Sequence, residues 1–159
     1  MATSSNKELV IYTDGASRGN PGPVLYGAIL QWGSSRKELS AGFRRTTNNR
    51  MELMAVIAAL EALNREGLQI TIYSDSQYVV KAVMEGWLKN WIATDFKGGK
   101  KNKDLWTRFY KLMQKHQLRF VWVKGHAENP FNNRCDELAT AAADGRNLAV
   151  DTGFEDNLS

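Results

Sequence analysis

The chain has 159 residues, 43% of them hydrophobic, which suffices for one domain with a buried core and is short for two. A formal net charge of +4 favours an anionic partner, and much of the positive excess lies between residues 81 and 124. The single cysteine excludes an intramolecular disulfide, and the lack of long apolar runs argues against a membrane span or signal peptide. We therefore expect a soluble, cytoplasmic protein that does not contact a membrane.

The first part of the chain is predicted to be rich in strands. Residues 1–7 are small and polar, and we expect a flexible arm there. Residues 8–13 form an apolar run that predicts a buried strand. Two more strands are predicted over residues 26–32 and 38–44, joined by a polar turn. These three strands are expected to form a meander.

Helices and strands alternate in the rest of the chain. Apolar side chains from Leu53 to Leu63 recur at helical spacing, which predicts a long helix that ends before Gly67. A strand, a helix and a second strand then indicate a crossover onto a parallel pairing. The predicted elements are a helix over 49–66, a strand over 68–74, helices over 76–85 and 105–115, a strand over 118–124 and an Ala-rich helix over 132–143.

Four acidic residues lie where the chain leaves or enters a predicted element. Asp14 follows the first strand within the stretch TDGASRGNPGP, and Asp75 follows the fourth. Glu52 lies in the first turn of the long helix, where it could instead complete a capping box with Asn49. Asp75 could cap its own helix, Asp14 could form a turn, and Asp136, near the start of the last helix, could stabilise the helix dipole.

Taken together, the four carboxylates favour a metal site. Asp14 and Asp75 end strands at the same edge of one sheet, and helices can bring the other two acids over it. Such anions repel one another unless a divalent cation lies between them. Oxygen ligands without clustered Cys or His favour Mg²⁺ or Mn²⁺ over zinc. Two such ions about 4 Å apart would clamp the attacking and leaving oxygens of a phosphoryl displacement.

His126 lies in the Gly-led motif VKGHAENP, just after a predicted strand. A single loop histidine is more often a surface residue than a catalyst. Near a departing phosphate, however, it could transfer a proton at neutral pH.

A basic and aromatic segment, WLKNWIATDFKGGKKNKDLW, covers residues 87–106. Trp87 and Trp91 lie one helical turn apart, which suits a groove that packs on sugars and bases while ammonium groups meet phosphates. The alternative is a solvated loop with a buried tryptophan or two beneath it. The other members of the segment are Lys89, Phe96, Lys97, Lys100, Lys101, Lys103 and Trp106.

The stretch RRTTNNRMEL, residues 44–53, concentrates polar groups ahead of a predicted helix start. Free backbone N–H groups at that end favour an anion. Asn48 and Asn49 can both donate and accept, as a ribose 2′-hydroxyl requires of its partner. Helix capping would explain one of these residues but not all of them.

With these motifs assembled, the chain resembles the bacterial type 1 ribonucleases H. The blocks TDGASRGNPGP, TTNNRMELMAVIAALEAL, SDSQYV, KNKDLW and VKGHAENPFNNRCDELA occur in the family's order. The resemblance implies an α/β, ribonuclease H-like fold with a mixed five-stranded sheet in the order 3-2-1-4-5 flanked by helices. It also implies one catalytic domain over residues 8–145, followed by a tail over 146–159, and a monomer that hydrolyses the RNA strand of RNA–DNA hybrids.

The resemblance also implies roles for individual residues. The family's metal-binding carboxylates match Asp14, Glu52, Asp75 and Asp136, and its loop histidine matches His126. Contacts to the RNA strand are implied at Ser17, Asn20, Asn48, Asn49 and Gln77. A pocket for a DNA-strand phosphate is implied at Arg45, Thr47 and Asn102, and an aromatic DNA channel at Trp87 and Trp91.

The predicted chemistry is two-metal hydrolysis with little sequence preference. Our hypothesis is that Asp14 bridges two Mg²⁺ ions, with Mn²⁺ as a possible substitute, Asp136 completes the first site, and Glu52 and Asp75 complete the second. A water would then attack the scissile phosphorus and leave 5′-phosphate and 3′-hydroxyl ends. Three alternatives are a non-catalytic hybrid-binding module, a phospho-acceptor receiver domain and a nuclease or integrase of the same fold.

Overall fold

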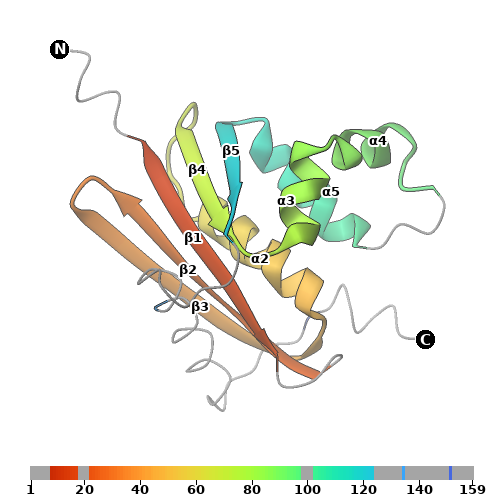
Figure 1. The fold of residues 1–159 in the computed structure, drawn as a ribbon, viewed down its shortest axis with the longest axis horizontal. Coiled ribbons are helices and arrows are strands. Elements are labelled where there is room, and N and C mark those ends of the chain that lie inside the picture. Colours follow the sequence, from red (N-terminus) through yellow and green to blue (C-terminus); the bar gives the residue numbers. More distant parts are fainter. Residues whose placement is uncertain (1–7, 18–21, 98–101, 124–133, 135–150, 152–159) are drawn as a thin grey trace.

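The computed structural model describes residues 8–17, 22–97, 102–123, 134 and 151. At its centre is a five-stranded sheet in the order β3-β2-β1-β4-β5, with β3 at one edge and β5 at the other (Figure 1). The predicted strand order is therefore confirmed. The strands are β1 (Leu9–Ser17), β2 (Gly22–Trp32), β3 (Ser35–Thr46), β4 (Gln69–Ser74) and β5 (Gln117–Trp122).

The pairing confirms a meander followed by a crossover. β1 pairs antiparallel with β2, and β2 antiparallel with β3, whereas β1–β4 and β4–β5 are parallel. β2 and β3 are longer than predicted because Trp32 pairs directly with Ser35, so that Gly33 and Ser34 alone form the turn. Gly33 has a φ of 59°, which a glycine adopts without steric cost.

Four helices are described: α2 (Asn48–Glu61), α3 (Gln77–Met84), α4 (Trp87–Ala93) and α5 (Lys103–Met113). α2 packs against β1 and β2, α5 packs against α2, and α3 packs against β5 and α4 (Figure 1). α3 and α5 confirm predicted helices. α4 is a separate helix because Gly86, with a φ of 80°, breaks the chain direction after α3. None of the described helices has the length and apolar character needed to span a membrane.

The long helix ends earlier than predicted. α2 stops at Glu61, with Ala62 as its C-cap, instead of continuing to residue 66. Leu63 lies beyond the helix but still packs against the core, which explains why the apolar pattern runs past the helical backbone. The predicted helix over 132–143 lies outside the described residues, apart from Arg134.

The main core lies between the sheet and the helices. Side chains from β1, β4, α2 and α5 meet there, and each is fully buried: Ile11, Ile57, Ile72, Trp106 and Phe109. This core fixes the position of α2 relative to β1 and β4, the three elements on or next to which three of the four predicted carboxylates lie.

Candidate metal centre and substrate surface

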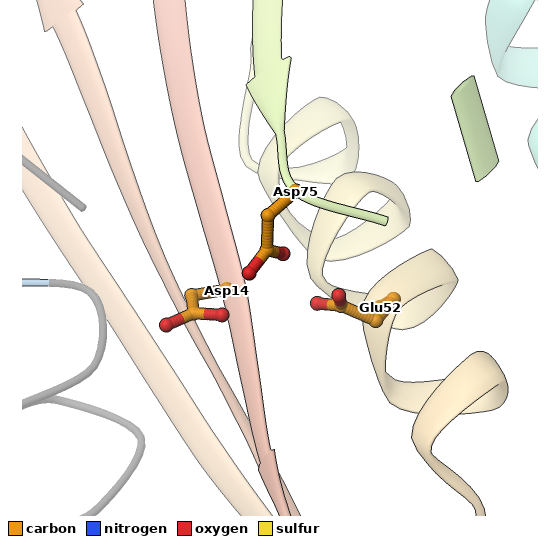
Figure 2. Close-up of side chains that lie close together, drawn as sticks. All are labelled: Asp14, Glu52 and Asp75. Carbon is orange, nitrogen blue, oxygen red and sulfur yellow. The ribbon is translucent and has the colours of Figure 1, made fainter. Parts of the chain in front are cut away.

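Three of the four predicted carboxylates converge at one point of the structure. Figure 2 shows Asp14 on β1, Glu52 on α2 and Asp75 just after β4, with their carboxyl groups turned toward one another. One oxygen from each lies within 4.8 Å of the others. Among the described residues, the structure therefore places together the acids that the sequence predicted to share a site.

The register of the parallel pair β1–β4 explains why the two aspartates meet. The last parallel pair is Tyr12 with Tyr73, whose rings stack at 5.0 Å between centroids. Asp14 and Asp75 each follow that pair by two residues. Equal offsets from a paired position bring the two carboxylates to the same level of the sheet.

Asp14 lies inside a strand and not after it. β1 continues to Ser17 as the antiparallel partner of β2, and Asp14 pairs with Gly27. Only the parallel pairing with β4 ends before Asp14. The prediction that the strand ends at this residue was therefore wrong, and Asp14 is held by backbone pairing on one side of β1.

Glu52 is not a capping residue. The N-cap of α2 is Thr47, whose Oγ1 accepts a hydrogen bond from the backbone N–H of Arg50 at 3.4 Å. Asn49 is therefore already inside the helix, and the first turn contains no acidic residue. Glu52 is the fifth residue of α2 and lies just after the first turn, so the predicted first-turn position was wrong, and a capping box with Asn49 is excluded.

The capping alternative for Asp75 is excluded as well. The N-cap of α3 is Ser76, whose Oγ accepts from the backbone N–H of Val79 at 3.2 Å. Asp75 is instead fixed through its carbonyl oxygen, which accepts from Nε1 of Trp122 at 3.2 Å. The sequence analysis missed Trp122. Its signal was an aromatic residue at the carboxyl end of a strand, in register with Ser74 at the end of β4.

The electrostatics of the cluster suit a bound cation. Burial raises the pKa of the Glu52 carboxyl well above its usual range. The charge of Asp75, a hydrogen bond with Asp75 and the charge of Asp14 raise this pKa further, whereas a hydrogen bond with the backbone N–H of Gly15 lowers it. Among the described residues, Glu52 Oε1 is buried without a hydrogen-bond partner. A divalent cation among the carboxylates would remove this cost, and oxygen ligands suit a hard ion. The residues present therefore fit such a metal.

Several predicted RNA-contacting residues lie next to these carboxylates. Asn48 and Asn49 are exposed in the first turn of α2, just ahead of Glu52. Gln77, the first residue of α3, is exposed two positions after Asp75. Their amides are therefore accessible on the elements that carry the acids. Of Ser17 only the backbone, at the end of β1, is described, and Asn20 lies outside the described residues.

The predicted phosphate pocket is described only in part. Asn102 lies just before α5, and its side chain hydrogen-bonds with Arg50 and Tyr78. The hydroxyl of Thr47 caps α2, while nothing is described of the Arg45 side chain. The structure therefore gives the surroundings of Asn102, and the phosphate pocket stays a prediction.

The basic and aromatic segment divides between surface and core. Trp87 is 42% exposed, Trp91 is half-buried, and their rings lie 6.4 Å apart. Phe96 and Trp106 belong to the buried core. The alternative of a tryptophan buried beneath the segment is thus correct for Trp106, whereas the pair predicted to line a channel remains accessible.

The lysines of this segment also differ from one another. Lys89 and Lys97 are exposed, and Lys103 lies 2.8 Å from Asp95 in an exposed ion pair. The remaining lysines and two predicted catalytic residues lie outside the described residues, and their roles stay predictions: Lys100, Lys101, His126 and Asp136.

Arg50 forms a buried network that the sequence analysis missed. Its guanidinium donates to both carboxylate oxygens of Asp104, at 2.9 and 2.7 Å, and of Asp151, at 2.8 and 3.0 Å. A fifth bond, of 3.2 Å, goes to Oδ1 of Asn102. Hydrogen bonds from Arg50 lower the pKa of Asp104. The partners lie too far from Arg50 along the chain for any local sequence signal to show them.

Comparison with known proteins yields consistent matches. The RNase H family model matches residues 6–144. The Ribonuclease H of Desulforamulus reducens is 52% identical over 158 residues, covering 95% of this chain and 99% of the relative. The Ribonuclease H of Lachnoclostridium phytofermentans is 53% identical over 158 residues, covering 93% of this chain and 99% of the relative.

Solved structures agree with this result. LC9-RNase H1, described as a type 1 RNase H with the type 2 active-site motif, is similar with a TM-score of 0.78 and 26% identity, over 94% of this chain and 80% of that one. LC11-RNase H1 in complex with RNA/DNA hybrid is similar with a TM-score of 0.64 and 26% identity, over 86% of this chain and 97% of that one. Because the family match includes the three elements that bring Asp14, Glu52 and Asp75 together, the chain belongs to the ribonuclease H family.

Proposed function

We propose that this protein hydrolyses the RNA strand of RNA–DNA hybrids with two bound Mg²⁺ ions, for which Mn²⁺ can substitute. The observation that carries the proposal is the cluster of Asp14, Glu52 and Asp75, whose oxygens lie within 4.8 Å of one another. Curated relatives at about half identity are named Ribonuclease H, and one structural neighbour was solved with an RNA/DNA hybrid. Both facts favour this substrate over duplex DNA.

In this proposal, the three clustered acids and Asp136 hold the metal. When bound, the cations supply an activated water for attack on the scissile phosphorus and stabilise charge on the leaving 3′-oxygen, which gives 5′-phosphate and 3′-hydroxyl ends. Glu52 must be ionised to serve as a ligand, although burial favours its protonated form. His126 is proposed to transfer a proton near the departing group.

Recognition of the two strands is proposed to come from different elements. Exposed amides at Asn48, Asn49 and Gln77 can donate to and accept from a ribose 2′-hydroxyl, and DNA would leave them without that partner. Ser17 and Asn20 are proposed to join this RNA-binding set. The DNA strand would contact Arg45, Thr47, Asn102, Trp87 and Trp91.

We further propose that the protein acts as a monomer in the cytoplasm. One cysteine leaves no possibility of an intramolecular disulfide, and the relatives cited above are bacterial. An RNA–DNA hybrid is therefore the one macromolecular partner that the proposal requires.

A cleavage assay tests the proposed function. End-labelled RNA–DNA hybrid, duplex DNA and duplex RNA are incubated with the protein, with and without Mg²⁺. We expect cleavage of the hybrid's RNA strand only, and only with the metal. Asp14→Asn and Glu52→Gln should each lower the rate more than about 100-fold while hybrid binding persists. Glu66→Gln, an exposed glutamate away from the cluster, is the matched control for Glu52→Gln. Equal cutting of duplex DNA would refute the assignment.

A further inference from the structure

Arg134 is fixed to the edge strand β3 by a two-point ion pair with Glu38. Nε of Arg134 donates to Oε2 of Glu38 and Nη2 donates to Oε1, each at 3.0 Å. Nη2 of Arg36 donates to the same Oε2 at 2.8 Å. Two parallel bonds between a guanidinium and a carboxylate fix direction as well as distance. Glu38 therefore orients a residue that lies 96 positions further along the chain.

Glu38 lies on the face of the sheet opposite α2. Directly paired residues of neighbouring strands point to the same face, and Glu38 pairs with Ile29, which in turn pairs with Tyr12. Ile11, which packs in the main core with α2, has the opposite alternation. Asp14 follows Tyr12 by two residues within β1 and so belongs to the same face as Glu38. Arg134 is thus held on the face to which Asp14 belongs, whereas α2 lies on the other.

The chain leads from Arg134 to the proposed metal ligand Asp136 in two residues. Although Asp136 lies outside the described residues, covalent geometry keeps its Cα within about 7 Å of the Cα of Arg134. Glu38 lies two strands from β1 and two residues from the level of Asp14, a separation of about 12 Å. An arginine side chain and two residues of chain together are long enough to span that separation. The position of Arg134 therefore limits how Asp136 can reach the carboxylate cluster.

The stability of the fold does not account for this pair. The Arg134 and Glu38 side chains are 42% and 30% exposed, and exposed ion pairs contribute little to the free energy of unfolding. Residues that hold a metal ligand in place act instead on metal affinity and activity. We propose that Glu38 is a positioning residue for metal binding, which acts by holding Arg134 and thereby Asp136 beside the carboxylate cluster. The inference rests on the proposed function, in which Asp136 is a metal ligand, and adds Glu38 and Arg134 to it.

The first test measures Mn²⁺ binding to the protein without hybrid, from the loss of the electron paramagnetic resonance signal of free Mn²⁺. Glu38→Gln removes the charge and one of the two acceptors that Arg134 uses. We expect it to weaken binding about 5- to 10-fold, because Glu38 acts one step further from the metal than a residue that bonds a ligand directly. In an Asp136→Asn background the same change should have no effect. Loss of a negative charge acting over distance would instead weaken binding in both backgrounds.

A change at Arg134 tests whether the two-point geometry is required. Arg134→Lys keeps the positive charge but loses the planar fork, so it should weaken Mn²⁺ binding to a similar extent. The double variant Glu38→Gln/Arg134→Lys should bind Mn²⁺ no more weakly than Glu38→Gln alone, because both changes break the same pair. Arg36→Gln removes the third bond of Glu38 and leaves the pair with Arg134, so Mn²⁺ affinity should stay close to that of the parent.

Glu61→Gln is the matched control for Glu38→Gln. Glu61 on α2 accepts two bonds from Arg108 on α5, and these side chains are exposed to a similar degree, 37% and 45%. Its loss should leave Mn²⁺ affinity unchanged, and the two variants should show equally small shifts in urea unfolding. In steady-state cleavage, the Mg²⁺ concentration for half-maximal rate should rise about 5- to 10-fold in Glu38→Gln only. Its rate should recover at saturating Mg²⁺, with KM for hybrid unchanged.

The outcomes distinguish this inference from the proposed function. If Glu38→Gln binds Mn²⁺ as tightly as the parent, if Glu61→Gln weakens binding equally, or if the effect of Glu38→Gln persists in the Asp136→Asn background, the positioning role is wrong even though the enzyme still cleaves hybrid. If the unaltered protein cleaves no hybrid with Mg²⁺, the proposed function itself fails.

Discussion

Arg50 and Asp151 form a buried ion pair although they lie 101 residues apart in the sequence. Nε of Arg50 donates to Oδ2 of Asp151 at 2.8 Å, and the two side chains are 4% and 8% exposed. The hydroxyl of Thr46 donates to the same Oδ2 at 2.6 Å. A residue near the end of the chain thereby fixes the start of α2, the helix that carries Glu52.

The Asp151→Asn variant should be markedly less stable than the parent. Removing one partner of a buried ion pair leaves the other charge poorly compensated, and the expected loss in free energy of unfolding is about 3 kcal/mol. Asp104 still faces Arg50 and limits the loss. Urea unfolding at neutral pH measures the loss in free energy of unfolding.

Asp95→Asn is the control, because it removes an ion pair with Lys103 in which the Asp95 and Lys103 side chains are 80% and 55% exposed. This change should lower the free energy of unfolding by less than about 1 kcal/mol. Equal losses in the two variants would contradict this prediction.

The Glu52→Gln variant should be more stable than the parent at neutral pH when no metal is present. The pKa of Glu52 is raised in the folded state, mainly by burial and then by Asp75 and Asp14, so ionisation opposes folding as the pH rises above the ordinary value of 4.5. Below that pH both states are protonated, and the advantage of glutamine should vanish. Urea unfolding in EDTA at pH 7 and at pH 3.5 provides the comparison.

The pH dependence is the decisive part of the Glu52→Gln experiment. Glu66→Gln serves as the control, since the Glu66 side chain is 73% exposed. It should change stability little at either pH. A gain for Glu52→Gln of the same size at both pH values would show that packing, and not ionisation, is responsible.

Mg²⁺ should raise the melting temperature of the parent protein but not that of Asp75→Asn. A ligand that binds only the folded state adds about 2.7 kcal/mol at one hundred times its Kd. Loss of Asp75 removes one of the three clustered oxygens, so the affinity for the ion should fall. Calorimetric scans with increasing MgCl₂ measure the shift, and choline chloride at three times the MgCl₂ concentration provides the control at the same ionic strength. A parallel rise in both proteins would exclude binding at this cluster.

The sequence predicted those features that depend on local pattern and strand order. Apolar runs and helical spacing placed the strands and helices, and the expected common sheet edge of Asp14 and Asp75 placed two of the predicted carboxylates together. The end of α2 was missed because Leu63 continues the apolar spacing and packs against the core beyond the helix. Burial is what apolar spacing reports, and it does not require a helical backbone.

Features that depend on distant partners were not predictable in the same way. Thr47 and Asn49 are both good capping residues, and the structure gives the extended backbone of an N-cap, with φ −122° and ψ 160°, to Thr47. Arg50 belongs to a polar stretch of the sequence, yet the structure buries it, because Asp104 and Asp151 approach from positions 54 and 101 residues away. Charge pattern within a short window does not contain that information.

The indole of Trp122 is expected to position Asp75 for metal binding. Its Nε1 donates to the carbonyl oxygen of Asp75 at 3.2 Å, and Trp122→Phe removes this bond while keeping an aromatic ring. Loss of a residue that holds a metal ligand in place commonly costs about 10- to 100-fold in activity or metal affinity. For Trp122→Phe we expect about a 10-fold lower kcat at limiting Mg²⁺, with partial recovery at high Mg²⁺.

Trp87→Phe is the control, because the exposure of Trp87, 42%, is similar to the 41% of Trp122. Trp87 lies on the proposed DNA-binding surface, so its replacement should raise KM and leave the Mg²⁺ requirement unchanged. Titrations of cleavage rate against Mg²⁺ and against hybrid separate the two effects. If both variants respond alike to Mg²⁺, Trp122 does not act through Asp75.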